Sequence, residues 1–137
     1  MRLYNVRGAL VTKNVSKYVM KWDKPSKSKI QFQTKQFLKK FWIGCICYEE
    51  FPVYGTLLKV DILNASLKIA VEVNGPQHSE YHWFHNGRPT EFLNSNHRDM
   101  DKMDWLEKNN FKLAEINYDE VPLLSKEFFR EKFDIIL

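Results

Sequence analysis

The feature that most constrains this chain is a pair of β-forming runs separated by a short gap that begins with a polar residue. Residues 57–63 and 68–74 are both rich in β-forming side chains, and the four residues 64–67 lie between them. Two such runs joined by a few turn-prone residues predict a β-hairpin. The stretch from Ile69 to Val73 is apolar except for Glu72, which is typical of a strand buried at the centre of a sheet. We therefore expect a sheet built around this hairpin.

The remaining elements are predicted from periodicity and from start and stop signals. Residues 43–53 predict a further strand, which would complete an antiparallel meander of three. The other predicted elements are a helix over 29–42 capped by Ser28, a helix over 92–109, a strand over 111–116 and a helix over 125–133 capped by Ser125. Residues 22–29 are the most linker-like part, and 11–20 fit either a short helix or an irregular arm. The order predicts a single α/β domain with a mixed sheet over residues 1–137.

Positive charge is concentrated at the start of the chain. Residues 1–40 carry eleven Lys or Arg and one Asp, a balance of +10, whereas the remaining residues have a balance of −6. Because Lys and Arg release counterions from a phosphate backbone, a long polyanion is the natural partner of this part of the chain. Aromatic residues among these bases favour an ordered nucleic-acid surface over a merely solvated one, so we expect residues 1–30 to form a basic DNA-contacting segment. The lysines expected to contact DNA are Lys13, Lys17, Lys21, Lys24, Lys27, Lys29 and Lys35.

Composition argues against a membrane or a disulfide-stabilised protein. The sequence has no run of 18 apolar residues and no signal-peptide pattern at its start. Its two cysteines, Cys45 and Cys47, lie two apart on one predicted strand, where neighbours of this kind do not usually bridge. We therefore expect a reduced, intracellular, cytoplasmic protein.

Two acidic residues on the hairpin carry the predicted chemistry. Side chains alternate along a strand with period two, so a turn centred between Ala65 and Lys68 places Asp61 across from Glu72. Directly opposed residues have Cβ atoms about 4.5–5.5 Å apart, and two carboxylates this close repel unless a cation lies between them. Either acid alone would more simply be an exposed strand residue. An acid within an apolar run is costly unless it has a partner, so the pair predicts a Mg²⁺ site, at which Mn²⁺ is expected to substitute.

Residues after Glu72 extend this candidate site. Asn74 lies on the same strand face as Glu72, and Gln77 and His78 follow the end of the strand. A metal-bound water is a nucleophile for phosphodiester hydrolysis, and the metal also stabilises charge on the leaving oxygen. His78 is the best candidate for proton transfer, because its unperturbed pKa is about 6.5.

The run from Val60 to Ile62, followed after nine residues by the run from Glu72 to His78, resembles the PD-(D/E)XK nucleases. The resemblance is to the branch of very-short-patch repair endonucleases and phage homing endonucleases, and it covers roughly residues 28–118. It implies a restriction-endonuclease-like α-β-β-β-α-β core with a mixed central sheet, followed by a C-terminal helix within 119–137. It also implies Mg²⁺-dependent cleavage of double-stranded DNA, with Asp61 and Glu72 as the metal ligands.

The resemblance extends through the stretch that begins at His97, and on it alone Asp99 and Lys102 are catalytic candidates. The chain departs from the family pattern at Asn74, which stands where the family has a lysine. The residues that could take over the lysine's role are Gln77, His78, Lys102 and Lys68.

The helical glutamate of the family also lacks a clear match. Glu49 and Glu50 are the nearest substitutes, and we expect Glu49 to face the site, although sheet parity leaves the choice between them open.

Three functions fit these observations. The first is a site-specific, phage-type homing endonuclease, encoded by a phage in a bacterial host and serving intron homing. The second is a repair or recombination nuclease, such as a mismatch nickase or junction resolvase. The third is a non-catalytic DNA-binding protein on a degenerate nuclease core, which the missing lysine favours. A homodimer or higher homo-oligomer is expected, because one small protomer offers little surface for a long target and two-fold symmetry supplies two active sites.

Overall fold

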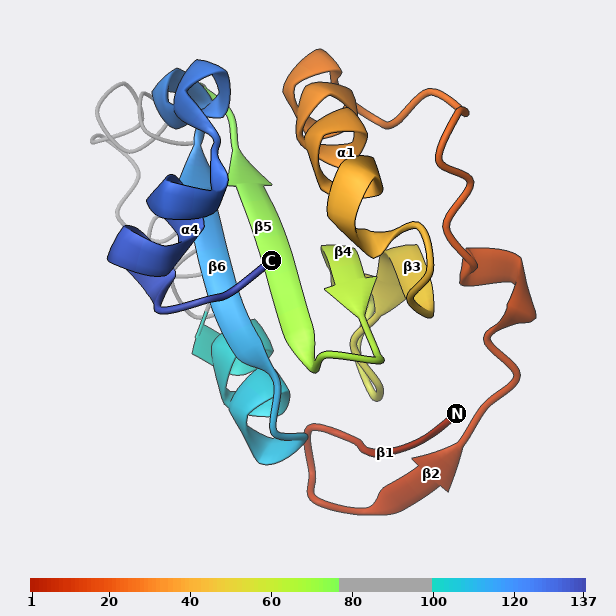
Figure 1. The fold of residues 1–137 in the computed structure, drawn as a ribbon. Coiled ribbons are helices and arrows are strands. Elements are labelled where there is room, and N and C mark those ends of the chain that lie inside the picture. Colours follow the sequence, from red (N-terminus) through yellow and green to blue (C-terminus); the bar gives the residue numbers. More distant parts are fainter. Residues whose placement is uncertain (77–99) are drawn as a thin grey trace, which may run out of the picture.

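A four-stranded sheet forms the centre of a mixed α/β fold in the computed structural model, which describes residues 1–76 and 100–137 (Figure 1). The sheet order is β3-β4-β5-β6. Its strands are β3 (Cys47–Pro52), β4 (Lys59–Asn64), β5 (Ile69–Asn74) and β6 (Lys112–Asn117). The first three form the predicted antiparallel meander, and β6 pairs with β5 in parallel, so the predicted mixed sheet is confirmed.

Helices α1 and α4 begin where the sequence predicts. Helix α1 (Lys29–Trp42) starts after Ser28, whose side-chain oxygen accepts the backbone N–H of Gln31 at 3.2 Å. Helix α4 (Lys126–Phe133) starts after Ser125, which caps it in the same way. A 3₁₀ segment, η2 (Tyr118–Leu123), links β6 to α4. The helix predicted over 92–109 is confirmed at 100–108, and its predicted start lies outside the described residues.

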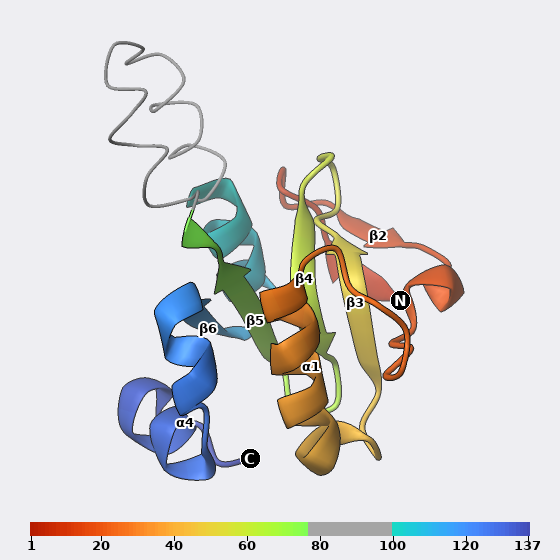
Figure 2. The same cartoon turned by 90° about the horizontal axis from the view of Figure 1, so that it is seen from above.

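The sheet lies between two layers of helices and strands (Figure 2), and an apolar cluster fills the space on each side of it. Helices α1 and α4 cover one face, where Trp42 packs with Ile62 and Val71. The N-terminal strands and the 100–108 helix cover the other face, where Trp105 packs with Ala70. Because side chains alternate along β5, this strand contributes to both layers and is buried on both sides. The strand that carries Glu72 is therefore central, as its apolar composition predicts.

The N-terminal residues form a small sheet that the sequence does not predict. Strands β1 (Arg2–Tyr4) and β2 (Leu10–Thr12) pair antiparallel, and η1 (Ser16–Tyr18) follows as a 3₁₀ turn. Trp105 Nε1 donates to the Tyr4 carbonyl at 2.7 Å, and Asn109 Oδ1 accepts the Tyr4 N–H at 2.8 Å. Partners about a hundred residues away hold β1, so local periodicity carries no signal for it.

Hydrogen bonds to residues of α1 and β3 hold the segment 21–28, which corrects the prediction of a linker for this region. The ammonium of Lys35 donates to the carbonyls of Lys21 at 3.1 Å and Lys24 at 2.6 Å, and it pairs with Glu49 at 3.0 Å. Lys35 is completely buried. The prediction that Lys35 contacts DNA is therefore wrong, because its charge is enclosed beneath the segment.

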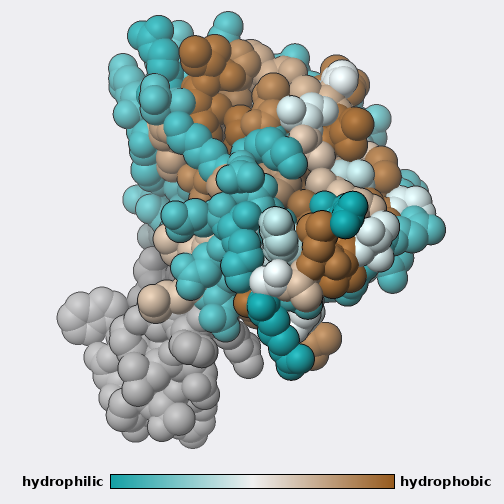
Figure 3. Space-filling model, turned by 90° about the horizontal axis from the view of Figure 1, so that it is seen from below, coloured by the Kyte–Doolittle hydropathy of each residue, from teal (hydrophilic) through white to brown (hydrophobic). Residues whose placement is uncertain are grey.

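The surface shows no single extended apolar face from the side drawn in Figure 3. Hydrophobic areas there are divided by hydrophilic side chains. Among the helices of residues 1–76 and 100–137, none combines the length and the apolar character needed to cross a bilayer.

Candidate active site

Asp61 and Glu72 meet where β4 and β5 separate. The β4–β5 ladder ends at the Ile62–Val71 pair, and continuing the same register places Asp61 opposite Glu72. Beyond this point the two strands diverge (Figure 1). The structure thus brings together the two carboxylates that the sequence predicts as a pair.

Each carboxylate accepts a hydrogen bond from a backbone N–H group of the other strand, at the place where the two strands no longer pair through their backbones. Glu72 Oε2 accepts the Asp61 N–H at 2.9 Å, and Asp61 Oδ2 accepts the Val73 N–H at 2.8 Å. Both residues are buried, with exposed fractions of 4% for Asp61 and 9% for Glu72. These bonds fix the direction of both side chains and leave one oxygen on each, Oδ1 and Oε1, for other partners.

Two lysines neutralise those remaining oxygens. Lys27, from the segment before α1, places its Nζ 2.7 Å from Asp61 Oδ1 and 3.7 Å from Glu50 Oε1. Lys102, from the 100–108 helix, pairs with Glu72 Oε1. The site therefore consists of acids and ammonium groups drawn from several separate elements.

Negative charge dominates the electrostatics of this cluster. Burial and the nearby Asp61 charge raise the pKa of Glu72 to about 7, although Lys102 and the Asp61 N–H act in the opposite direction. Burial disfavours the charged form of Lys27, but Asp61, Glu50 and Glu72 outweigh it and raise the pKa of Lys27 above its ordinary value. The charge of Asp61 thus acts on both groups in the direction that favours an added positive charge.

Glu49 lies away from this cluster. Its Oε2 accepts hydrogen bonds from Ser26 at 2.6 Å and from Gln31 at 2.9 Å, and its Oε1 pairs with Lys35. The expectation that Glu49 faces the site is therefore corrected, since its carboxylate serves the interface between β3, α1 and the segment 21–28.

Glu50 is the acid of β3 that lies near Asp61. The β3–β4 register skips from Glu49 to Phe51, which leaves Glu50 opposite Asp61. Its φ of 52° is left-handed, a conformation uncommon for residues other than glycine. Its buried Oε1 has no hydrogen-bond partner among the described residues. Assigning residues to sheet faces from the sequence assumes a regular strand. The local distortion at Glu50 therefore prevents the sequence from showing which of Glu49 and Glu50 faces the site.

Among the other predicted site residues, two lie at opposite ends of β5 and three fall outside the described residues. Asn74 lies at the end of β5, where its Nδ2 is 3.5 Å from Asn117 Oδ1 on β6. Lys68 lies at the opposite end of β5, with its Nζ 4.9 Å from the Phe111 ring centroid, so its candidacy for the family lysine's role is wrong. Three predicted residues lie outside the described part of the chain: Gln77, His78 and Asp99.

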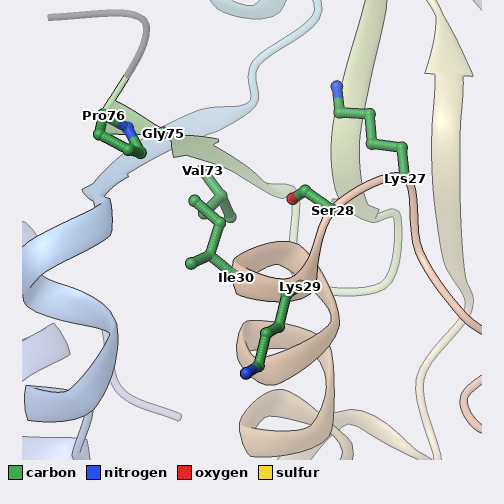
Figure 4. A pocket seen from close by; sticks show the side chains of 7 residues that line it. All are labelled: Lys27, Ser28, Lys29, Ile30, Val73, Gly75 and Pro76. Atoms are coloured by element: carbon green, nitrogen blue, oxygen red, sulfur yellow. The ribbon is translucent and has the colours of Figure 1, made fainter.

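A cavity of about 400 Å³ lies between the start of α1 and the end of β5 (Figure 4). Ile30 and Val73 face one another across it, and Lys27 and Lys29 lie at its edge. The cavity shares two residues with the acidic cluster, because Lys27 pairs with Asp61 and the Val73 N–H bonds to the same carboxylate. A ligand in this cavity would therefore contact two residues that also bind Asp61.

Most of the lysines predicted to contact DNA are exposed along one edge of the molecule. The chain from the N-terminal hairpin to α1 runs beside β3, where Met20 donates its N–H to the Cys47 carbonyl at 2.9 Å (Figure 1). Lys27 differs from the rest because it is engaged with Asp61. The exposed members other than Lys27 are Lys13, Lys17, Lys21, Lys24 and Lys29.

The donors present fit a hard divalent cation. Within residues 1–76 and 100–137, no cluster of three or more His, Cys, Asp or Glu side chains is placed to hold an ion. Two adjacent carboxylates, each with one oxygen held only by a lysine, nevertheless match Mg²⁺, which binds one or two carboxylates and keeps several waters. Comparisons with family models, curated proteins and solved structures find no match for this chain.

Proposed function

We propose that this protein is a Mg²⁺-dependent endodeoxyribonuclease that hydrolyses phosphodiester bonds in double-stranded DNA. The observation that carries the proposal is the buried Asp61–Glu72 pair, whose side chains are fixed by opposite-strand N–H groups and balanced by two ammoniums. Keeping two adjacent acids in a core is costly without a cationic partner. Asp61 and Glu72 would hold the ion, which supplies an acidic water and stabilises the leaving oxygen when bound.

Lys102 is the residue proposed for the role of the family lysine. Asn74 cannot provide a charge, and its amide lies near Asn117. Lys102 reaches Glu72 from the 100–108 helix, which places an ammonium beside the carboxylate pair. It would neutralise a phosphate oxygen and orient the attacking water.

The substrate side of the proposal rests on charge and space. The exposed lysines along the β3 edge would bind phosphates flanking the cut. The 400 Å³ cavity would accept a sugar or base next to the scissile phosphate, since its walls include Ile30 and Val73. The finer proposal is a site-specific homing endonuclease that acts as a dimer, because one protomer offers a single active site for two strands.

Cleavage of supercoiled plasmid tests this function. The wild-type protein should nick or linearise DNA with Mg²⁺ or Mn²⁺, and a chelator should abolish the activity. Asp61→Asn and Glu72→Gln should each reduce the rate by at least about 100-fold, because loss of the groups that merely support a metal ligand already costs about 10- to 100-fold. Glu107→Gln, an exposed acid on the Lys102 helix, is the matched control and should cut at the wild-type rate. Equal cleavage by all four proteins would refute the proposed site.

The choice of DNA separates the nuclease classes. A homing endonuclease cuts intact duplex at a defined sequence, so cleavage should map to one position on a long target. A repair or recombination nuclease would prefer mismatched or branched duplexes over their intact counterparts. Tight DNA binding with no cleavage under any divalent ion would favour the non-catalytic interpretation.

A further inference from the structure

The ammonium of Lys27 occupies the space beside Asp61 that a bound cation would need. It lies 2.7 Å from Asp61 Oδ1, the oxygen left free by the backbone hydrogen bonds, and 3.7 Å from Glu50 Oε1. We propose that Lys27 is a tethered counterion that holds this position in the metal-free protein and gives it up to the divalent ion. The inference rests on the proposed function, since it concerns the same metal site.

The charge balance of the cluster favours such an exchange. When Glu72 is ionised, the carboxylates of Glu50, Asp61 and Glu72 face the two ammoniums of Lys27 and Lys102, which leaves one negative charge in excess. Adding a divalent ion while both ammoniums stay would leave one positive charge in excess. Replacing one ammonium by the ion makes the cluster neutral, which is the most favourable balance in a poorly solvated site.

Lys27 is better suited to leave than Lys102. The Lys27 side chain is 56% exposed, whereas that of Lys102 is 19% exposed. Lys27 is also one of the residues that line the 400 Å³ cavity, so its side chain has open space nearby into which it can turn away from Asp61. After the exchange it would remain at the cavity edge, where it could pair with a phosphate of the substrate.

A buried network holds the backbone that carries Lys27. Lys35 binds the carbonyls of Lys21 and Lys24, and its ion pair with Glu49 keeps that ammonium in place. Ser26, next to Lys27, donates to the same Glu49 carboxylate at 2.6 Å. Lys35 is therefore a positioning residue: it fixes the segment 21–28, so that the exchange requires movement of the Lys27 side chain alone.

Calorimetric titration with Mn²⁺, combined with thermal melting of the metal-free protein, tests this inference without any activity measurement. Lys27→Met removes the competing ammonium, so it should bind Mn²⁺ about five- to tenfold more tightly than wild type. The same variant should melt at a lower temperature without metal, because Asp61 loses its counterion. Lys29→Met, the exposed neighbour at the cavity edge, is the control and should change neither quantity.

The combination of tighter binding and lower metal-free stability is specific to a displaced counterion. A lysine with only a structural role would lower stability without improving the affinity for Mn²⁺. Lys27→Gln, which keeps a hydrogen-bond donor for Asp61, should also bind Mn²⁺ more tightly and provides the measurement if Lys27→Met does not fold. Unchanged or weaker binding in a folded variant, with a wild-type protein that binds the ion, overturns the inference and leaves the nuclease proposal standing. Absence of Mn²⁺ binding in all the proteins overturns both.

Discussion

Glu72→Gln isolates the electrostatic cost of the acidic pair in the metal-free protein. Burial beside Asp61 raises the pKa of Glu72 to about 7, compared with 4.5 for the unperturbed group. A carboxyl group with a raised pKa binds its proton more tightly in the folded state than in the unfolded state. Its contribution to stability is therefore fully present below pH 4.5 and is lost as the pH rises through about 7.

The size of the effect follows from the shift. Each pKa unit corresponds to about 1.36 kcal/mol, so the free energy of unfolding of the wild-type protein, relative to Glu72→Gln, should fall by about 2.5 kcal/mol between pH 5 and pH 8. The glutamine of the variant cannot titrate, and all other groups are shared by the two proteins. Subtracting the two pH profiles therefore isolates the contribution of Glu72.

Urea denaturation followed by circular dichroism at pH 5, 6, 7 and 8, in a chelating buffer, measures this difference. The reasoning is refuted if the difference in the free energy of unfolding between the two proteins stays constant within about 0.5 kcal/mol from pH 5 to pH 8. A constant difference would mean that the carboxyl group of Glu72 has the same pKa in the folded and unfolded states. Repeating the denaturation at pH 8 with a divalent ion in place of the chelator measures how much the ion stabilises each protein. Mg²⁺ at ten times its Kd should stabilise the wild-type protein by about 1.4 kcal/mol and the variant much less.

Three further predictions concern the scaffold around the site. Lys35→Met should lower the free energy of unfolding by about 3–5 kcal/mol in urea titrations, because Glu49 would be left without its buried partner. Lys40→Met, on the exposed side of α1, is the control and should cost under about 0.5 kcal/mol. Ser28→Ala should cost about 1 kcal/mol through loss of the α1 cap, and a larger loss for Ser28→Gly would contradict a capping role. Trp105→Phe should cost about 1 kcal/mol and speed amide hydrogen exchange in β1, whereas unchanged exchange there would show that its indole does not hold that strand.

The confirmed predictions depend on short-range patterns. Helix α1 starts at its serine cap and ends at residue 42, as apolar spacing predicts, and the four central strands appear in the predicted order. The pairing of Asp61 with Glu72 follows from strand alternation and a short turn. In these cases the nearest neighbours along the chain, or across one hairpin, determine the geometry.

The surroundings of the pair required tertiary information. The sequence predicts Lys27 as one of several DNA-contacting lysines, and nothing in its local sequence distinguishes it from Lys29. The structure separates them, because the segment 21–28 crosses the end of the sheet and delivers Lys27 to Asp61. Glu50 likewise joins the cluster through a left-handed backbone that interrupts the alternation of β3.

The sequence by itself determined the central strand, the hairpin register and the opposed carboxylates, because a period-two pattern and a short turn leave few alternatives. Only the tertiary structure decided which charges balance those carboxylates. It buried Lys35 beneath the segment 21–28, directed Lys27 to Asp61 and brought Lys102 to Glu72. The two ion pairs of the site join residues 34 and 30 positions apart, and their geometry depends on how the helices pack against the sheet rather than on any local preference.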